Sequence, residues 1–425
     1  SRDDPPPGPR RVKPRVAIVY TGQGEETAAS YHFAHYFGAC LYLTGYSSVR
    51  LVPYVRGGAS KRKSKAEPLP AQTEVLCVPY GEEAAKAVRV EQNDDFRMGA
   101  DMSAVKECQL VLVCVNPPDT EACGTKLAAL LPKNQNIGIF CLQYGVKNYA
   151  ALEPCFEDSG NITFDGAVGL YVSQHSQTGA LQCLAGGSLV LERLSREKVD
   201  WGTKYLNLLE SSMVPILFRK VLTPFTWGNL VHDTVLATNA LTGGSLQAHL
   251  RVRLNRLVYA QMIRECLQAF TVASKNGKWE PDGSAAGPFS LKMLELVLCL
   301  PNLLFSPLMF LFVTYAPDCG SPMQVDLHAR RSTNMGWSIS ELCDVGRKHS
   351  VAMPAVKSVR TQLKAAIESG NGVPSISPAE LYAQAGKPTR STRELTTKLL
   401  WWAGGTALLV VFFLLLEVVI PRKGL

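Results

Sequence analysis

Short apolar runs alternate with segments of helical spacing through the first half of the chain. The run LVLVCV at residues 110–115 is apolar at every position, which is typical of a strand buried on both faces of a sheet. Strands that alternate with helices predict a parallel, doubly wound sheet, and residues 164–191 read as antiparallel strands that close it. The other predicted strands cover residues 15–20, 49–55, 75–78 and 137–142, and predicted helices cover residues 25–43 and 120–131.

The pattern changes near residue 199, where long segments with helical periodicity replace the short apolar runs. An α/β domain over residues 15–198 is therefore expected to precede an all-α domain over residues 199–370. Residues 371–396 contain Pro, Ser and Gly and are predicted to be a linker. The helices are expected at residues 199–211, 224–241, 246–275, 288–316, 321–350 and 354–370.

The most apolar stretch of the chain begins at Leu399 and ends at Ile420, with Glu417 as its only charge. A helix of this length spans a hydrocarbon core of about 30 Å, so one transmembrane helix is predicted over residues 397–421. More basic residues precede the stretch than follow it, which predicts that the N-terminal domains lie in the cytosol or the mitochondrial matrix. Because a carboxylate within lipid is costly, Glu417 is expected to face a partner helix or the headgroups.

A second apolar stretch runs from Leu291 to Tyr315 but contains Pro301 and Pro307. Two prolines interrupt the backbone ladder of a helix, so a straight membrane span is not expected there. The stretch is predicted to be either part of the protein core or a hydrophobic surface that rests on lipid or on another subunit.

Composition narrows the class of protein. Hydrophobic residues make up 46% of the 425 residues, so the chain can bury large cores. The net charge of +8 is too thinly spread to argue for a nucleic-acid partner. Twelve cysteines include no C-x-x-C pair, which argues against a zinc site and favours buried thiols in a reducing compartment. The chain starts at Ser1 without an initiator Met, which fits either the removal of an N-terminal targeting peptide or a trimmed chain, and residues 1–14 are predicted to be a Pro-rich extended arm.

Several strings, in this order, resemble the ketopantoate reductase (2-dehydropantoate 2-reductase) family. They are RVAIVYTGQGEET, VRLVPYVR, LVLVCVNPPDTEACGTKLAALLP, IGIFCLQYGVKN, WGNLVHDTVLATNALTGG, SPMQVDLHARRSTN and GRKHSVAMPAV, and together they cover residues 15–369. The resemblance implies a Rossmann-like domain that binds NADP(H), followed by a helical domain of the 6-phosphogluconate-dehydrogenase-like kind. It also implies an active site in the cleft between the two domains.

The resemblance places a glycine fingerprint for the dinucleotide after the first strand. If the fingerprint is counted from the end of that strand, Tyr20 stands at its first glycine position and Gly22 at its second. If it is instead counted from Gly22, the chain has glycines at the first two positions, Gly22 and Gly24, and lacks the third glycine. Glu25 adds negative charge where phosphates would lie, so the glycine pair is alternatively a simple tight turn. Arg56 matches the family's arginine for the adenosine 2′-phosphate, or else belongs to a solvated basic loop.

The resemblance also shows that recognisable functional positions are altered. The general-acid lysine of the family falls on Asn229, whose amide has no titratable proton for a developing alkoxide, and the family's glutamate falls on Asn334. The altered positions are Asn116, Tyr144, Asn229, Asp233, Pro322 and Asn334.

These substitutions predict a pseudoenzyme without catalytic residues, metal or required cofactor. We expect an accessory subunit of a membrane complex, in the mitochondrial inner membrane with its domains on the matrix side, and a respiratory-chain complex is the assembly that we favour. One alternative is an active membrane-anchored NADPH-dependent 2-keto acid reductase that uses Tyr144 or Asp233 as proton donor. The other is a pseudoenzyme that retains NADP(H) as a structural ligand on Gly22 and Arg56.

Overall fold

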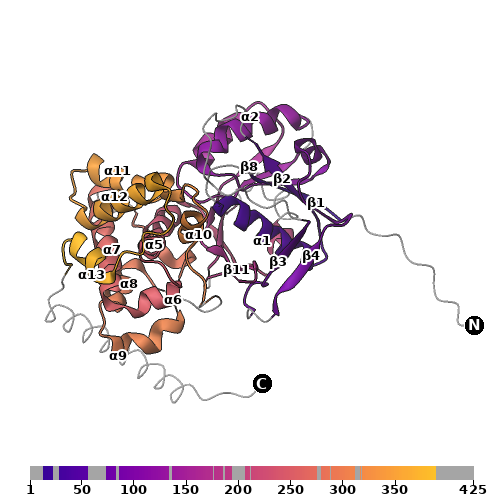
Figure 1. The fold of residues 1–425 in the computed structure, drawn as a ribbon. Coiled ribbons are helices and arrows are strands. Elements are labelled where there is room, and N and C mark those ends of the chain that lie inside the picture. Colours follow the sequence, from indigo (N-terminus) through magenta and orange to yellow (C-terminus); the bar gives the residue numbers. More distant parts are fainter. Residues whose placement is uncertain are drawn as a thin grey trace, which may run out of the picture.

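The computed structural model describes most of the chain between residues 13 and 388 (Figure 1). The described residues are 13–22, 28–55, 73–82, 86–133, 136–175, 177–184, 187–193, 206–210, 212–274, 279–287, 289–311, 316 and 318–388. Within these ranges no helix has the length and apolar character that a bilayer span requires. The predicted transmembrane helix at residues 397–421 and most of the predicted arm lie outside the described residues.

A six-stranded parallel sheet in the order β5-β2-β1-β6-β7-β8 forms the centre of the N-terminal lobe. This sheet confirms the predicted doubly wound architecture. Its strands are β1 (Arg15–Thr21), β2 (Ser48–Tyr54), β5 (Phe96–Arg97), β6 (Leu110–Val113), β7 (Gly138–Cys141) and β8 (Ile162–Phe164).

Side chains of β1 alternate between two cores on opposite faces of the sheet. Val16 and Ile18 pack in the core that contains α1 (Ala29–Leu43), whereas Ala17 and Val19 pack in the core that contains α2 (Thr120–Leu130). Both faces of this strand are therefore buried, which is why its sequence is apolar at consecutive positions.

Helix α1 is buried along almost its whole length because a second sheet covers the side that faces away from β1. Gly38 allows α1 to approach the first sheet, since a Cβ at this position would lie 2.8 Å from Cδ2 of Leu51. The second sheet has the order β10-β11-β3-β4 and also packs on the core of α1. Its strands are β3 (Glu74–Cys77), β4 (Val88–Glu91), β10 (Val172–Gln174) and β11 (Leu181–Cys183).

The antiparallel strands predicted between residues 164 and 191 are present, but they do not close the first sheet. Strand β9 (Gly166–Val168) pairs antiparallel with β12 (Leu189–Glu192) in a third sheet, and β10 pairs antiparallel with β11 in the second. Strand β8, which ends at Phe164, instead extends the first sheet in parallel.

The helical domain begins later than the sequence pattern indicated. Strand β13 (Ile216–Arg219) pairs in parallel with β12, and Leu209 and Val214 are buried in the core of α1. The predicted boundary at residue 198 is therefore too early, because the next segments of the chain still complete the N-terminal lobe. The change to helices comes with α5 (Thr223–Thr242).

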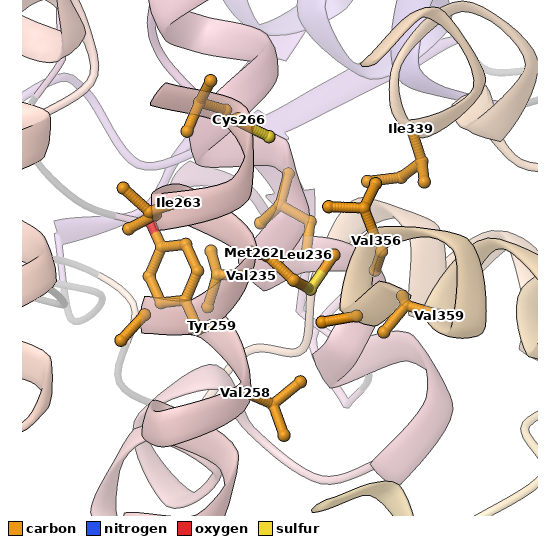
Figure 2. Packing of buried hydrophobic residues seen from close by; sticks show 14 of the residues in the cluster. Val235, Leu236, Val258, Tyr259, Met262, Ile263, Cys266, Ile339, Val356 and Val359 are labelled. Carbon is orange, nitrogen blue, oxygen red and sulfur yellow. The ribbon is translucent and has the colours of Figure 1, made fainter. Parts of the chain in front are cut away.

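Helix α5 runs through the centre of the C-terminal lobe and is buried at nearly every position from Gly228 to Leu241. The close-up in Figure 2 shows Val235 and Leu236 of α5 packed with Tyr259 and Met262 of α7, and with Val356 of α12. The helices of this lobe are α5, α6 (Leu246–Arg251), α7 (Arg253–Ala273), α8 (Leu291–Leu298), α9 (Asn302–Phe305), α10 (Pro322–His328), α11 (Ile339–Lys348), α12 (Pro354–Ser369) and α13 (Pro378–Gln384).

Several long helices predicted for this lobe are divided, and the predicted linker is partly folded. Val252 separates α6 from α7, and Pro301 lies between α8 and α9. Helix α13 lies inside the predicted linker, where Leu381 is buried in the core of the helical domain and the backbone amide of Ile376 donates to the carbonyl of Leu241. The first part of residues 371–396 thus belongs to the domain.

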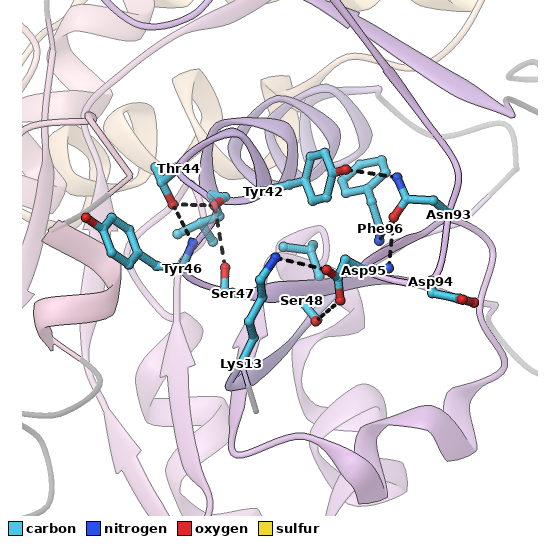
Figure 3. A network of polar contacts seen from close by, with 12 residues as sticks. Lys13, Tyr42, Thr44, Tyr46, Ser47, Ser48, Asn93, Asp94, Asp95 and Phe96 are labelled. Atoms are coloured by element: carbon cyan, nitrogen blue, oxygen red, sulfur yellow. Dashed lines mark hydrogen bonds and ion pairs between the residues drawn. The ribbon is translucent and has the colours of Figure 1, made fainter. Parts of the chain in front are cut away.

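A polar network fixes the start of β1 at the edge of the sheet opposite to the carboxyl ends of its strands (Figure 3). The ammonium of Lys13 lies 2.9 Å from Oδ2 of Asp95, and Ser48 donates to Oδ1 of the same carboxylate at 2.6 Å. These hydrogen bonds lower the pKa of Asp95. The chain before residue 13 therefore joins the domain at a well-anchored point.

Candidate functional site

The crevice in which doubly wound sheets bind ligands lies at the carboxyl ends of β1 and β6, where the strand order reverses. Thr21, the last residue of β1, joins the loops at this edge. Its hydroxyl donates to Oδ2 of Asp119 at 2.9 Å and accepts from the backbone amide of Asn116 at 2.8 Å. Asn116, at the position of a family lysine, is 2% exposed and belongs to this network, and the buried Asp119 adds negative charge to the crevice.

The connection from β1 to α1 differs from a dinucleotide fingerprint. Tyr20, at the first glycine position, is buried with its ring edge-on to His35 at 4.8 Å, and burial raises its pKa to about 12. Gly22 approaches β2 closely, because its amide donates to the carbonyl of Tyr54 and a Cβ would lie 3.2 Å from that oxygen. Helix α1 begins only at Ala29, whereas in the fingerprint the glycines open the helix directly. Gly24 and Arg56, the other predicted cofactor residues, lie outside the described residues.

The N-terminus of α1 holds a carboxylate from the helical domain. The backbone amide of Ala28, the N-cap residue, donates to Oδ1 of Asp326 at 2.8 Å, and Nε of Arg331 lies 3.2 Å from the same oxygen. Asp326 is 1% exposed and Arg331 is 6% exposed. The free amides at a helix N-terminus attract anions, and in dinucleotide-binding domains the pyrophosphate lies there. Here Asp326 of α10 is bound at this end of α1.

The next turn of α1 is unfavourable for a further positive charge. His32 is fully buried, and burial together with the nearby Arg331 lowers its pKa to about 3. His35 is also buried and has a pKa lowered to about 4. Both imidazoles are therefore neutral at physiological pH, and Arg331 is the cation that faces the Asp326 carboxylate.

A buried polar cluster occupies the family's catalytic positions on α5. The amide of Asn229 donates to the carbonyl of Val168 at 3.0 Å, and the hydroxyl of Tyr171 donates to the carbonyl of Asn229 at 3.1 Å. Asp233 lies one turn further along α5. Burial raises the pKa of Asp233 to about 7, although a hydrogen bond with Tyr171 lowers it. The predicted acid position thus belongs to a network that joins α5 to the N-terminal lobe.

The alternative proton donor, Tyr144, is also hydrogen-bonded within the protein. Its hydroxyl donates to the carbonyl of Leu170 at 2.9 Å, and its ring is parallel to that of Tyr171 with centroids 6.5 Å apart. Burial raises the pKa of Tyr144 well above its usual value. A phenol with this pKa that already donates to a carbonyl is a poor general acid at neutral pH.

The two remaining altered positions have local structural roles. Pro322 occupies the first turn of α10, where its fixed backbone angle suits a helix start, and the N-cap Ser321 accepts from the amide of Gln324. Asn334 is buried, and its carbonyl accepts a hydrogen bond from the hydroxyl of Ser338 at 2.9 Å. The structure thus brings Asn229, Asp233 and Tyr144 together around Tyr171. Pro322 and Asn334 instead lie at the starts of short helices.

Sequence reasoning missed three residues that define this site: Asp326, Arg331 and Tyr171. Asp326 and Arg331 lie in the string SPMQVDLHARRSTN, in which only the family's serine and glutamate positions were compared. The sequence did contain a signal for an ion pair, because Asp326 and Arg331 carry opposite charges only five residues apart beside apolar residues. No signal in the sequence shows that Asp326 meets Ala28, because the two are 298 residues apart. Across the described ranges, no group of three or more His, Cys, Asp or Glu side chains could hold a metal ion.

Solved structures with the same arrangement of domains are reductases and dehydrogenases. A ketopantoate reductase from Ralstonia eutropha matches with a TM-score of 0.56 at 18% identity, and covers 84% of this chain and 99% of its own. The chain has the fold of the ketopantoate reductases. A 2-dehydropantoate 2-reductase from Geobacter metallireducens gives a TM-score of 0.54 at 16% identity over 83% of this chain and 99% of its own.

A D-mandelate dehydrogenase, solved with NADH and anilino(oxo)acetate, has the same reductase fold. Its TM-score is 0.55 at 16% identity, and the match covers 84% of this chain and 99% of that chain. No protein-family model matches the sequence, and no curated protein is similar to it. The resemblance read from the sequence is thus confirmed for the fold.

Proposed function

We propose that the protein is a catalytically silent reductase fold that serves as an accessory subunit of a membrane complex. The observation that carries this proposal is the Asp326 carboxylate at the N-terminus of α1, where a dinucleotide would place its pyrophosphate. A second anion at this point would be repelled by Asp326, and by the nearby Asp119, in a region from which water is largely excluded.

The residues at the catalytic positions support the same proposal. Reduction of a keto group by hydride transfer requires a group that gives a proton to the developing alkoxide. Asn229 offers only an amide, and that amide donates to the carbonyl of Val168. Asp233 is buried and hydrogen-bonded to Tyr171, and the Tyr144 hydroxyl donates to a backbone carbonyl. The side-chain donors of Asn229 and Tyr144 are thus both taken up by backbone carbonyls, while Oδ1 of Asn229 is buried and has no hydrogen-bond partner among the described residues.

The membrane part of the proposal rests on the sequence from Leu399 to Ile420. We place the two lobes on the matrix side of the mitochondrial inner membrane, within a respiratory-chain complex, because of the charge bias around this stretch and the reduced cysteines. None of the twelve cysteines forms a disulfide bond, and eleven of them are buried.

The test uses the full chain purified in mild detergent from its native membrane. We expect it to migrate on a native gel with other subunits, to release no NADP(H) on denaturation, and to oxidise no NADPH with ketopantoate. Migration as a lone chain would overturn the accessory role. Release of NADP(H) without turnover would favour the alternative in which the nucleotide is a structural ligand, and turnover would establish the active reductase.

A further inference from the structure

Helix α9 lies at the end of the helical lobe (Figure 1), and its side chains include two neighbouring exposed leucines. The side chain of Leu303 is 84% exposed and that of Leu304 is 54% exposed, whereas Phe305 is buried. Single exposed leucines are common, but an adjacent pair on a short helix is a contiguous apolar tip. It lies in the stretch from Leu291 to Tyr315, which the sequence left open between core and contact surface.

A buried arginine holds this tip in place. The guanidinium of Arg256 donates to the carbonyls of Leu250 and Leu300 and to Oδ1 of Asn302, and its Cζ lies 4.0 Å from the ring centroid of Phe305. These bonds tie the start of α9 to the end of α6. The exposed leucines are therefore presented by a fixed turn.

Two exposed cations lie at the same corner. Arg251 ends α6, and its carbonyl accepts a hydrogen bond from Arg256 at 3.2 Å, while Arg253 begins α7. Both side chains are exposed. An apolar tip with basic neighbours matches the interface of a bilayer that contains anionic lipids, where leucines enter the acyl boundary and arginines meet the headgroups.

We propose that α9 is a membrane-docking tip that inserts Leu303 and Leu304 into an anionic bilayer surface, with Arg251 and Arg253 at the headgroups. This inference rests on the proposed anchoring of the chain through residues 399–420. The path from residue 388, the last described residue, to Leu399 reaches at most about 37 Å at roughly 3.4 Å per residue, so an anchored chain keeps the helical lobe close to the bilayer. Docking of α9 would fix the orientation of that lobe.

The experiment measures the depth of a nitroxide label by electron paramagnetic resonance. Leu303→Cys is made in the full chain with Cys155→Ser, because Cys155 is the one cysteine that is not buried. Val272→Cys in the same background is the matched control. Val272 is 51% exposed and stands at the far end of α7, roughly 29 Å from Arg253 at ~1.5 Å per residue. The chain is reconstituted into vesicles of phosphatidylcholine with phosphatidylserine.

We expect the label at position 303 to be accessible to oxygen and shielded from a water-soluble nickel chelate, and the label at position 272 to show the opposite. Arg251→Gln and Arg253→Gln, or vesicles of phosphatidylcholine alone, should lower the ratio of docked to undocked label by roughly fivefold for each arginine whose attraction to anionic lipid is removed. The backbone carbonyl of Arg251 that accepts from Arg256 remains in the variant.

Vesicle flotation separates the two levels of the proposal. If the chain floats with the vesicles but both labels stay in water, the docking tip is wrong and the anchor stands. If the chain does not float, the proposed membrane function itself is wrong. Equal shielding of the label at position 303 in detergent and in vesicles would show that protein covers the tip. If the depth of this label changes neither with the arginine substitutions nor with the lipid composition, the proposed contact with anionic lipid is wrong.

Discussion

The cleft region and the α9 tip are opposite in the chemistry that they bury and expose. At the cleft, the Asp326 carboxylate and the Arg331 guanidinium are buried as a pair, and two tyrosine hydroxyls donate to backbone carbonyls, whereas at α9 two leucines face the solvent. Burying charge is unfavourable unless it is paired, and exposing adjacent leucines brings no gain in folding. The difference is that the cleft holds its buried charges in contacts within the chain, whereas the tip leaves apolar side chains in water, as the proposed docking to a bilayer requires.

The largest effect on stability is expected from replacing Arg331, the buried cation of the cleft. In Arg331→Met the Asp326 carboxylate stays buried beside Ala28 without its cation, which should lower the free energy of unfolding by about 3–5 kcal/mol. Urea unfolding followed by tryptophan fluorescence measures the change. The control is Arg347→Met, whose pair with Asp344 is 79% and 54% exposed, and which should cost about 0.2–1 kcal/mol. Equal effects would show that burial of the Asp326–Arg331 pair adds nothing to its contribution to stability.

Acidification should destabilise the protein through its buried histidines. Their folded-state pKa values lie below the unfolded value, so the unfolded chain takes up protons first as the pH falls below about 6.5, and stability is lost. The four histidines are His32, His35, His232 and His249, with pKa values of about 3 to 4.

Two buried aspartates oppose this trend. Burial raises the pKa of Asp165 and of Asp233 to about 7, so each contributes stability that is present at low pH and lost as the pH rises from about 4 to 7. Four histidines outweigh two aspartates, and we expect a net loss of roughly 3 kcal/mol between pH 6.5 and pH 5. Urea midpoints across this range give the slope, and a flat or reversed profile would contradict the assignment.

Replacing Asp233 with its neutral isostere tests one side of that balance. Asp233→Asn has no proton to lose, so the loss of stability that ionisation of Asp233 causes between pH 5 and pH 7 is absent from the variant, which should gain about 2 kcal/mol relative to the wild type over this range. The measurement is the difference between the free energies of unfolding at the two pH values. Glu280→Gln, which changes an exposed ion pair with Lys292, is the control and should leave the pH profile as it is.

The smallest effect on the free energy of unfolding is expected at the α9 tip. Leu303→Ser should change the free energy of unfolding by no more than about 0.5 kcal/mol, because the side chain is 84% exposed and has little to lose. Leu298→Ser, at a fully buried position of the neighbouring α8, should be strongly destabilising. A large loss from Leu303→Ser would mean that α9 packs within the chain and would weaken its assignment as a contact surface.

The sequence predicts the sheet better than the site. The runs at β1, β6 and β7 are apolar because both faces of those strands are covered, so they can be recognised locally. Strand β13 was missed because its pairing with β12 is not encoded in its own pattern. Helix α13 was missed because a short segment next to Pro and Gly resembles a linker until Leu381 is seen in the core.

The candidate site shows the same limit more clearly. The presence of Asn229 at the general-acid position could be read directly from a motif, but the hydrogen bond from its side-chain amide to the carbonyl of Val168 could not. The contact of Asp326 with Ala28 joins residues that are 298 positions apart in the sequence, and it follows from how α10 packs on the N-terminal lobe. Such contacts depend on the tertiary arrangement, for which a local pattern carries no information.

The hydrogen bond from the Ala28 amide to Asp326 also affects how the two lobes can move relative to each other. Enzymes with a cleft between two lobes commonly part those lobes to admit a ligand and to release a product. In this chain the hydrogen bond from Ala28 to Asp326 joins the two lobes across the place where a ligand would enter, and the side-chain amide of Asn229 joins them again at Val168. Both hydrogen bonds must break before the lobes can part, so these contacts oppose the opening that exchange of a ligand requires.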